Sequence, residues 1–406
     1  MVMKDSYLSI AKANSSDDVI GKKDFFSMTW KKVFEEANDN KASDIHIQQF
    51  EDSIRVRLRI LGEMCIIQEI LETPEIRTTL INRLKSLCHF ELNVNDEAQD
   101  RAFTLKLTNS RYRGVVTPGV FGENFVLRII RDEELPTIKN CLLPENIEKD
   151  LLYAINRKQG FICITGPTGS GKSTTLQATL MEISRIKKNV ITIEDPVERI
   201  IPDVVQQQIS PKLTWAKAIK AAMRQDPDVI LIGEIRDHES ASLALEAAQT
   251  GHLVLSTLHT NDVSGIVDRL IGLGVDRKLI ADNLLFISAQ RLTQKLCPNC
   301  RIENPRGGFD IGNGCDHCSH SKIKGVIGRQ PIIEYSLHPD SDSIMNFDKS
   351  RFKSTQLKTS LLSEAKRLSL DGVIAVEEAD QWEEKQVWQT NQNHPQNLNH
   401  GHANIQ

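Results

Sequence analysis

The sequence predicts an α/β fold with a largely parallel sheet, preceded by a smaller α+β domain. A glycine-rich loop stands between an apolar run and a helix-compatible run, and three further apolar runs each end in ionisable residues. Between Leu142 and about Leu337, segments typical of strands and helices alternate. This alternation is the pattern of a parallel sheet with helical crossovers.

Length and composition set broad limits on the class of protein. The 406 residues allow two or three domains, and the 40% hydrophobic content supports a core. The net charge of −4 offers no basic excess for nucleic acid. No apolar run reaches the roughly 20 residues of a membrane span, and the polar N-terminus lacks a signal-peptide core. We therefore expect a cytoplasmic protein that reaches a membrane only through partners.

The chain is predicted to have five parts. These are a weakly ordered N-terminus (1–24), an α+β domain (25–131), a linker (132–141), a larger α/β domain (142–380) with an insertion at about 295–320, and a disordered tail (381–406). The linker is predicted from the charged segment Arg131–Asn140, which contains a proline. The tail is rich in Asn, Gln and His, a composition that favours a solvated segment. Its histidines (His394, His400 and His402) could bind a metal, but this interpretation is disfavoured.

Two strands are predicted in the α+β domain. Ile54–Leu61 alternates strictly between basic and apolar residues, which predicts a half-buried strand with a basic face. The basic side chains are Arg55, Arg57 and Arg59, and the apolar ones are Val56, Leu58 and Ile60. The second strand is Asn124–Ile130.

The glycine-rich loop has the pattern Gly166-x-x-x-x-Gly171-Lys172-Ser173. It follows an apolar strand, Phe161–Ile164, and opens a helix predicted over Lys172–Ile186. That context identifies a P-loop, whose backbone N–H groups bind phosphate while the lysine reaches the β- and γ-phosphates and the serine ligates Mg²⁺. The predicted nucleotide-binding residues are Gly166, Pro167, Thr168, Gly169, Ser170, Gly171, Lys172, Ser173 and Thr174.

Three further strands end in residues suited to nucleotide hydrolysis. Val190–Ile193 is followed by Glu194, Asp195 and Glu198; Val229–Ile232 by Glu234, Arg236 and Asp237; and Leu253–Leu258 by His259. In a parallel sheet the carboxyl ends of the strands gather at one edge, where ligands bind. We therefore expect Glu194, Glu234 and His259 to converge on the P-loop; the alternative is that each acid caps the next helix or turn.

Four segments resemble the signature boxes of the secretion ATPase superfamily. They are Gly166–Thr175 (Walker A), Glu194–Glu198 (Asp box), Gly233–Asp237 (Walker B) and Gly251–Asn261 (His box), with Lys41–Gln48 similar to the family's N-terminal domain motif. The resemblance covers about residues 25–378 and is strongest to the type II secretion and type IV pilus assembly ATPases. It implies a hexameric ring of subunits, each with a PAS-like N-terminal domain and a RecA-like ATPase domain, with ATP between the two.

Residue roles follow from this resemblance position by position. Glu194 and Glu234 would share water activation and the organisation of Mg²⁺, with the base left open between them. His259 would sense the γ-phosphate, and Arg113 and Arg128 match the arginine fingers that the family's N-terminal domain supplies. The alternative for these two arginines is a solvated strand face.

A tetracysteine pattern predicts a structural zinc site. Cys297, Cys300, Cys315 and Cys318 have the spacing C-x₂-C-x₁₄-C-x₂-C, which suits two knuckles that share one ion. The alternatives are free thiols or two disulfides, and His317 and His320 are close enough in sequence to compete as ligands. The remaining cysteines (Cys65, Cys88, Cys141 and Cys163) are predicted to be buried thiols.

The resemblance implies the function and also shows departures from the family. Assembly-type members have such a tetracysteine insertion followed by a stretch like Gly325–Glu334, whereas retraction ATPases lack it. The implied function is an ATPase that drives pilin or pseudopilin assembly through an inner-membrane platform protein, using ATP, Mg²⁺ and Zn²⁺. Leu61 stands where the family usually has Asp, Asn95–Phe103 only loosely matches a Pro-Gln-Asp-Gly-Arg turn, and the large extra N-terminal domain is expected to be missing.

Three other functions compete with this prediction. A retraction or conjugation-type channel ATPase is disfavoured by the tetracysteine. A GTPase-like switch is disfavoured because no Asn-Lys-x-Asp motif is present; Asn40–Ser43 lacks the Asp. A DNA-binding zinc protein would need more cations than Arg291, Lys295 and Arg301, which flank the cysteines.

Overall fold

The computed structural model describes residues 19–105, 108, 110–131, 136–183, 187–319 and 322–382, with side chains from Met28 onward. The chain divides between Asp132 and Glu133 into two compact units. Val19–Asp24, for which the sequence predicted weak order, are helical. The predictions for residues 1–18 and for the tail beyond Trp382, with its three histidines, lie outside the described residues.

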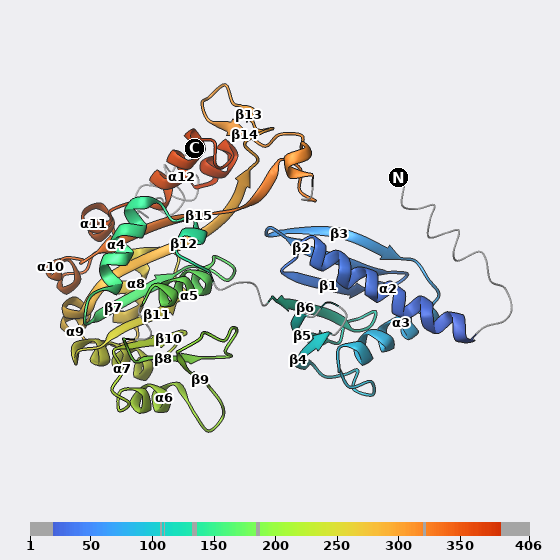
Figure 1. Cartoon of the computed structure of the whole chain (residues 1–406), viewed down its shortest axis with the longest axis horizontal. Helices are drawn as coiled ribbons and strands as arrows, with labels where there is room; N and C mark the ends of the chain where they lie inside the picture. Colours follow the sequence, from blue (N-terminus) through green and yellow to red (C-terminus); the bar gives the residue numbers. More distant parts are fainter. Residues whose placement is uncertain are drawn as a thin grey trace, which may run out of the picture. The chain divides into compact units, whose positions relative to one another are not determined.

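The N-terminal unit is an antiparallel sheet with two helices on one face (Figure 1). The strand order is β3-β2-β1-β6-β5-β4. Its elements are α2 (Val19–Asp39), β1 (Asp44–Gln49), β2 (Ile54–Ile60), β3 (Glu63–Ile70), α3 (Pro74–Leu87), β4 (Gln99–Leu105), β5 (Ser110–Thr117) and β6 (Asn124–Ile130). This is an α+β arrangement, and its PAS-like character stays a prediction.

The alternation predicted for β2 is confirmed. Its apolar side chains are buried under α2 and α3, and its arginines lie on the opposite face of the sheet. The indole of Trp30 on α2 donates to the carbonyl of Leu80 on α3 at 2.8 Å, which fixes the two helices together over the core.

The C-terminal unit contains a seven-stranded sheet in the order β15-β12-β7-β11-β10-β8-β9. All of its pairings are parallel except β12–β15. Its strands are β7 (Gly160–Thr165), β8 (Val190–Glu194), β9 (Val205–Gln208), β10 (Val229–Ile232), β11 (Leu253–Leu258), β12 (Leu284–Leu296) and β15 (Val326–Leu337), with β13 (Ile302–Glu303) and β14 (Phe309–Asp310) as a separate pair. This confirms the α/β fold with a largely parallel sheet.

Helices cover both faces of this sheet. Alternate residues of β7 enter two different cores, Phe161 and Cys163 on one face and Ile162 and Ile164 on the other. The helices are α4 (Glu145–Ile155), α5 (Lys172–Glu182), α6 (Trp215–Ala222), α7 (His238–Gln249), α8 (Val263–Gly272), α9 (Arg277–Asn283), α10 (Ser341–Met345), α11 (Lys349–Gln356) and α12 (Leu361–Leu370), with short 3₁₀ turns at Lys139–Cys141 and Asp316–Cys318. None of the described helices has the length and apolarity needed to cross a bilayer.

A buried ion pair organises the turn that precedes β4. The Lys85 ammonium on α3 is fully buried and donates to Glu123 (2.8 Å), to the Asn95 side chain (2.8 Å) and to the Val94 carbonyl (2.9 Å). A buried charge is tolerated only when its hydrogen bonds are satisfied, and these contacts meet that condition. The pair therefore joins α3 to the β5–β6 hairpin, which contains Glu123.

We expect Lys85→Met to destabilise the N-terminal unit by about 3–5 kcal/mol, because it leaves the Glu123 carboxylate buried without its partner. Arg101→Met provides the control: Arg101 pairs with Glu91 on the surface, and its loss should cost about 1 kcal/mol or less. Urea unfolding followed by hydrogen exchange at β1 and β6 measures both values. Equal destabilisation in the two variants would contradict the structural role of the buried pair.

Candidate functional site

The strand order places the four sequence motifs side by side. Strands β7, β11, β10 and β8 are consecutive in the sheet, and their carboxyl ends lead into the P-loop, His259, Glu234 and Glu194 respectively (Figure 1). Neighbouring strands are about 4.8 Å apart, so His259 follows the strand next to the P-loop strand and Glu234 the one after it. Glu194 lies one strand farther away.

The P-loop backbone requires glycine at two positions where it lies against β12. Gly166 has a φ of 150°, and a Cβ atom there would lie 2.4 Å from the carbonyl oxygen of Gln290. Gly171 has a φ of 88°, and its Cβ would lie 2.7 Å from the Gln290 side-chain nitrogen. A side chain at either position would force the loop away from β12.

The loop presents polar groups that suit a phosphate. Lys172 is only 8% exposed, and its ammonium donates to the carbonyls of Gly166 (2.8 Å) and Pro167 (3.1 Å). Burial lowers the pKa of Lys172, Arg291 lowers it further, and Glu234 opposes the shift. The buried Ser170 hydroxyl has no hydrogen-bond partner among the described residues. A cation at a helix N-terminus beside an unsatisfied hydroxyl fits a phosphate group.

Glu234 forms two contacts at the centre of this edge. One carboxylate oxygen accepts a short hydrogen bond from Arg236, and the other lies 3.8 Å from Nε2 of His259. Partial burial and Lys172 lower the pKa of His259 below its ordinary value, while Glu234 acts in the opposite direction. Arg236 thus pairs with Glu234, whereas the neighbouring Asp237 caps α7 by accepting from the Ser240 N–H at 2.8 Å.

Glu194 is held by a different set of partners. One carboxylate oxygen accepts from the Thr192 hydroxyl at 2.6 Å and from the Gln206 amide of β9 at 3.0 Å. The structure thus brings Glu234 and His259 to the P-loop lysine and places Glu194 toward the β9 side of the sheet. Asp237 takes the alternative role and caps the next helix, α7.

Arg113 and Arg128 lie opposite each other on the outward face of the N-terminal sheet. They are cross-strand partners in the β5–β6 ladder. Arg113 pairs with Asp100 at 2.9 Å and Arg128 with Asp44 at 3.0 Å, and both guanidinium groups are about half exposed, at 49% and 59%. Two arginines side by side form a ready site for an anion, provided that it displaces the two carboxylates.

Three residues of the site were not predicted from the sequence. The Thr165 hydroxyl, directly before the P-loop, donates to the Leu258 carbonyl at 2.8 Å and accepts from the Thr260 N–H at 2.7 Å. Gln290 accepts from the Thr175 hydroxyl at 2.9 Å, and Arg291 donates to the Asn261 carbonyl at 2.6 Å. Gln290 and Arg291 belong to β12, far from any nucleotide motif in the chain, so only the strand order reveals them.

The four clustered cysteines form a compact sulfur site. Their sulfur atoms all lie within 4.8 Å of one another, and the measured neighbours are Cys297–Cys315 at 3.7 Å, Cys300–Cys318 at 3.8 Å and Cys315–Cys318 at 3.9 Å. A tetrahedral zinc with Zn–S bonds of about 2.3 Å would separate its sulfurs by about 3.8 Å. The backbone N–H of Cys315 lowers the pKa of the Cys318 thiol, which favours the thiolate that a metal needs.

These distances bear on the disulfide alternative. No disulfide joins any of the eight cysteines, which argues against the pair of disulfides, and zinc in place of free thiols stays a prediction. The geometry fits a closed Cys₄ set without His317, which is exposed; His320 lies outside the described residues. Cys88 and Cys163 are buried as predicted, whereas Cys65 and Cys141 are only half-buried.

The sequence matches one family over most of its length. The family described as "Type II/IV secretion system protein" matches residues 21–381. The chain belongs to this family. Its relatives include "Type II secretion system protein E" of Dickeya dadantii, 37% identical over 73% of this chain and 63% of the relative, and "Type II secretion system ATPase E" of Vibrio cholerae, 36% identical over 75% and 64%. The chain thus spans just under two thirds of the length of these relatives.

Two solved structures share the fold. The pilus retraction motor PilT with bound ADP is 28% identical, with a TM-score of 0.60 over 86% of this chain and 95% of that one. The ATPase DotB of Legionella pneumophila has a TM-score of 0.66 at 23% identity, over 88% and 96%, and supports the fold alone.

We expect purified protein to hold about one zinc per chain and Cys300→Ser to release it, because three sulfurs leave the tetrahedral site open. Metal analysis and thermal unfolding of the C-terminal unit measure the two effects. Cys65→Ser, a half-buried thiol outside the cluster, is the matched control and should retain the metal. Zinc-free wild-type protein with the same melting temperature as Cys300→Ser would contradict a structural zinc site.

Proposed function

We propose that this chain is an ATP hydrolase that works as a hexameric motor of a type II secretion or type IV pilus assembly system. The observation that supports this most is the juxtaposition of Lys172, His259 and Glu234 at one edge of the sheet, in a member of the secretion ATPase family. Lys172 would bind the β- and γ-phosphates, and Ser173 would hold Mg²⁺, which neutralises phosphate charge when bound.

Within this proposal Glu234 is the residue that orients the attacking water. It is close enough to Lys172 and His259 to affect the pKa of both, whereas Glu194 lies one strand farther away and is fixed by Thr192 and Gln206. Glu234 is also bound by Arg236, so catalysis requires this pair to open and free the carboxylate. Glu194 would then order the neighbouring solvent and metal ligands.

Arg113 and Arg128 would supply the positive charge that meets the γ-phosphate as its bond breaks. The ATPase unit itself offers Lys172, Arg236 and Arg291 near the site, and each already has a partner. Arg113 is paired with the exposed carboxylate of Asp100, and Arg128 is itself 59% exposed although its partner Asp44 is buried. A phosphate of higher charge density can replace these carboxylates. The γ-phosphate would thus draw them from Asp100 and Asp44.

The tetracysteine favours an assembly motor over a retraction or conjugation-type channel motor. The relatives named for type II secretion support the same branch. In this proposal the hexamer is cytoplasmic and docks on an inner-membrane platform protein, without direct contact to nucleic acid. PilT, which is named for pilus retraction, shares the fold and marks the alternative.

We expect Lys172→Ala to abolish both nucleotide binding and hydrolysis, and Glu234→Gln to abolish hydrolysis while nucleotide binding persists. The lysine contacts phosphate in the ground state, whereas the carboxylate acts on the water. Calorimetric titration with ADP and a phosphate-release assay separate the two effects. Loss of affinity in Glu234→Gln as severe as in Lys172→Ala would show that Glu234 serves binding instead.

We expect the double variant Arg113→Ala/Arg128→Ala to lower turnover by roughly 10³-fold or more, with a much smaller effect on ADP affinity. Arg55→Ala is the matched control, since Arg55 lies on the same sheet and pairs with Glu69 at 2.8 Å. Its turnover should stay close to wild type. Full hydrolysis by the double variant would show that the catalytic positive charge comes from another source.

A further inference from the structure

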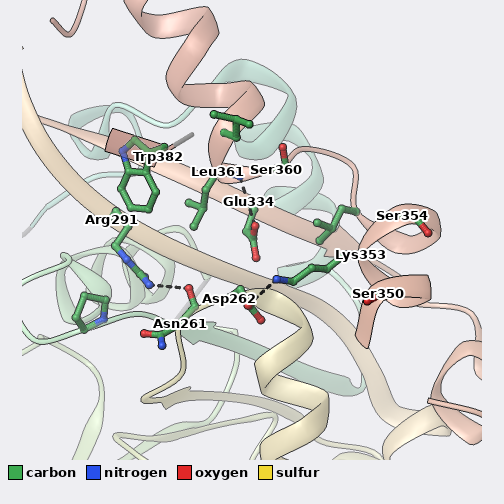
Figure 2. Close-up of a pocket in the computed structure, with 13 residues that line it drawn as sticks. Asn261, Asp262, Arg291, Glu334, Ser350, Lys353, Ser354, Ser360, Leu361 and Trp382 are labelled. Carbon is green, nitrogen blue, oxygen red and sulfur yellow. Dashed lines mark hydrogen bonds and ion pairs between the residues drawn. The ribbon is translucent and has the colours of Figure 1, made fainter. Parts of the chain in front are cut away.

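Helix α12 is fixed at one end to the loop that follows His259. The Glu334 side chain on β15 is 5% exposed, and its two oxygens accept the first backbone N–H groups of two helices. One accepts from Val263 of α8 at 2.6 Å. The other accepts from Leu361 of α12 at 3.4 Å (Figure 2). One buried carboxylate therefore caps both helices, and α8 begins four residues after His259.

The same loop is connected to the P-loop. The Thr260 N–H donates to Thr165 directly before Gly166, and the carbonyl of Asn261 accepts from Arg291 at 2.6 Å. Asp262 caps α8 and pairs with Lys353 of α11 at 2.8 Å. Asn261, Asp262, Arg291 and Lys353 line a pocket of about 740 Å³. Figure 2 shows their side chains. A shift of the His259 loop would move the start of α8 and, through Glu334, the start of α12.

The other end of α12 is fixed to the tetracysteine module, defined as residues 297–319 and 322–325. Arg301, next to Cys300, donates to the carbonyls of Asp371 (3.2 Å) and Gly372, and its guanidinium stacks on Phe309 at 4.1 Å. A Cβ at Gly308 would lie 2.9 Å from the Ser369 carbonyl oxygen, so the module packs directly on the end of the helix.

Between these ends α12 is a stiff element. Ser360 and Ser363 form a capping box, and Arg367 bridges Glu364 (2.7 Å) and Asp371 (2.8 Å). Leu361, Ala365 and Leu368 pack in one cluster with Ile332 of β15. Ten residues span about 15 Å, so a displacement at one end is passed to the other with little loss.

We propose that α12 is a connector that transmits the state of the nucleotide site to the tetracysteine module, with Glu334 and Arg301 as the positioning residues at its two ends. This inference rests on the proposed nucleotide binding and extends it by giving the metal module a response to the nucleotide. The tetracysteine module would then change its conformation or position with the nucleotide state, in addition to being a folded insertion.

Hydrogen exchange of the full chain, with and without Mg²⁺-ADP, tests the connector. In the wild type we expect ADP to change exchange at the first turns of α8 and α12 and at β13–β14. Glu334→Gln has one acceptor oxygen where the carboxylate has two, so the response should persist at α8 and fall about fivefold at β13–β14. Arg301→Lys keeps the charge but loses the planar guanidinium that stacks on Phe309 and places Nη1 between the two carbonyls, so the response should persist at α12 and fall at β13–β14.

Two exposed residues of the same region provide matched controls. Glu377→Gln and Arg351→Lys make the same chemical changes away from the connector and should leave every response at the wild-type level. Zinc content and melting temperature, measured on each variant, show that the fold is retained. If Glu334→Gln fails to fold, Arg301→Lys tests the connector by itself.

Different results would overturn the connector and the proposed nucleotide binding. Undiminished exchange responses at β13–β14 in both connector variants would overturn the connector. So would a wild-type protein that binds ADP, by calorimetry, with no response in the module. Absence of ADP binding to the wild type would overturn the proposed function, and the connector with it.

Discussion

The parallel pairing of β7, β11, β10 and β8 is the constraint on which the rest of the site depends. Because all four strands run in one direction, four motifs that are up to about a hundred residues apart in sequence meet at one edge. The order also ranks them: His259 and Glu234 are nearer to the P-loop strand than Glu194. Residues without a motif, such as Gln290, join the site because β12 is the other neighbour of β7.

The charged groups proposed for catalysis are held in pairs that hydrolysis would have to exchange. Glu234 is bound by Arg236, Arg128 by Asp44, and Lys172 by two loop carbonyls. In each pair a buried or half-buried charge has a hydrogen-bond partner, and burying that charge without a partner would cost free energy. A bound nucleotide would offer each cation a stronger partner and free Glu234, so binding and activation become a single rearrangement.

Much of the fold was predictable because its signals are local. The apolar runs that form β8, β10 and β11 are bounded by ionisable residues, and the alternation in β2 shows directly which face is buried. The pairing of Arg236 with Glu234 was not predictable, since spacing alone also allowed Asp237. Glu334 gave no signal of its role either, because a carboxylate that caps α8 and α12 is recognisable only when β15 lies beneath both helices.

We propose that this sheet edge brings Glu234, freed from Arg236, to the water that attacks the γ-phosphate. This proposal can be tested with a structure of the chain bound to ADP, Mg²⁺ and aluminium fluoride, which mimics the γ-phosphate in the transition state of hydrolysis. We expect the Glu234–Arg236 pair to be open and the Glu234 carboxylate to be hydrogen-bonded to the in-line water ligand of the aluminium. A closed Glu234–Arg236 pair, with Glu194 bonded to that ligand instead, would contradict it.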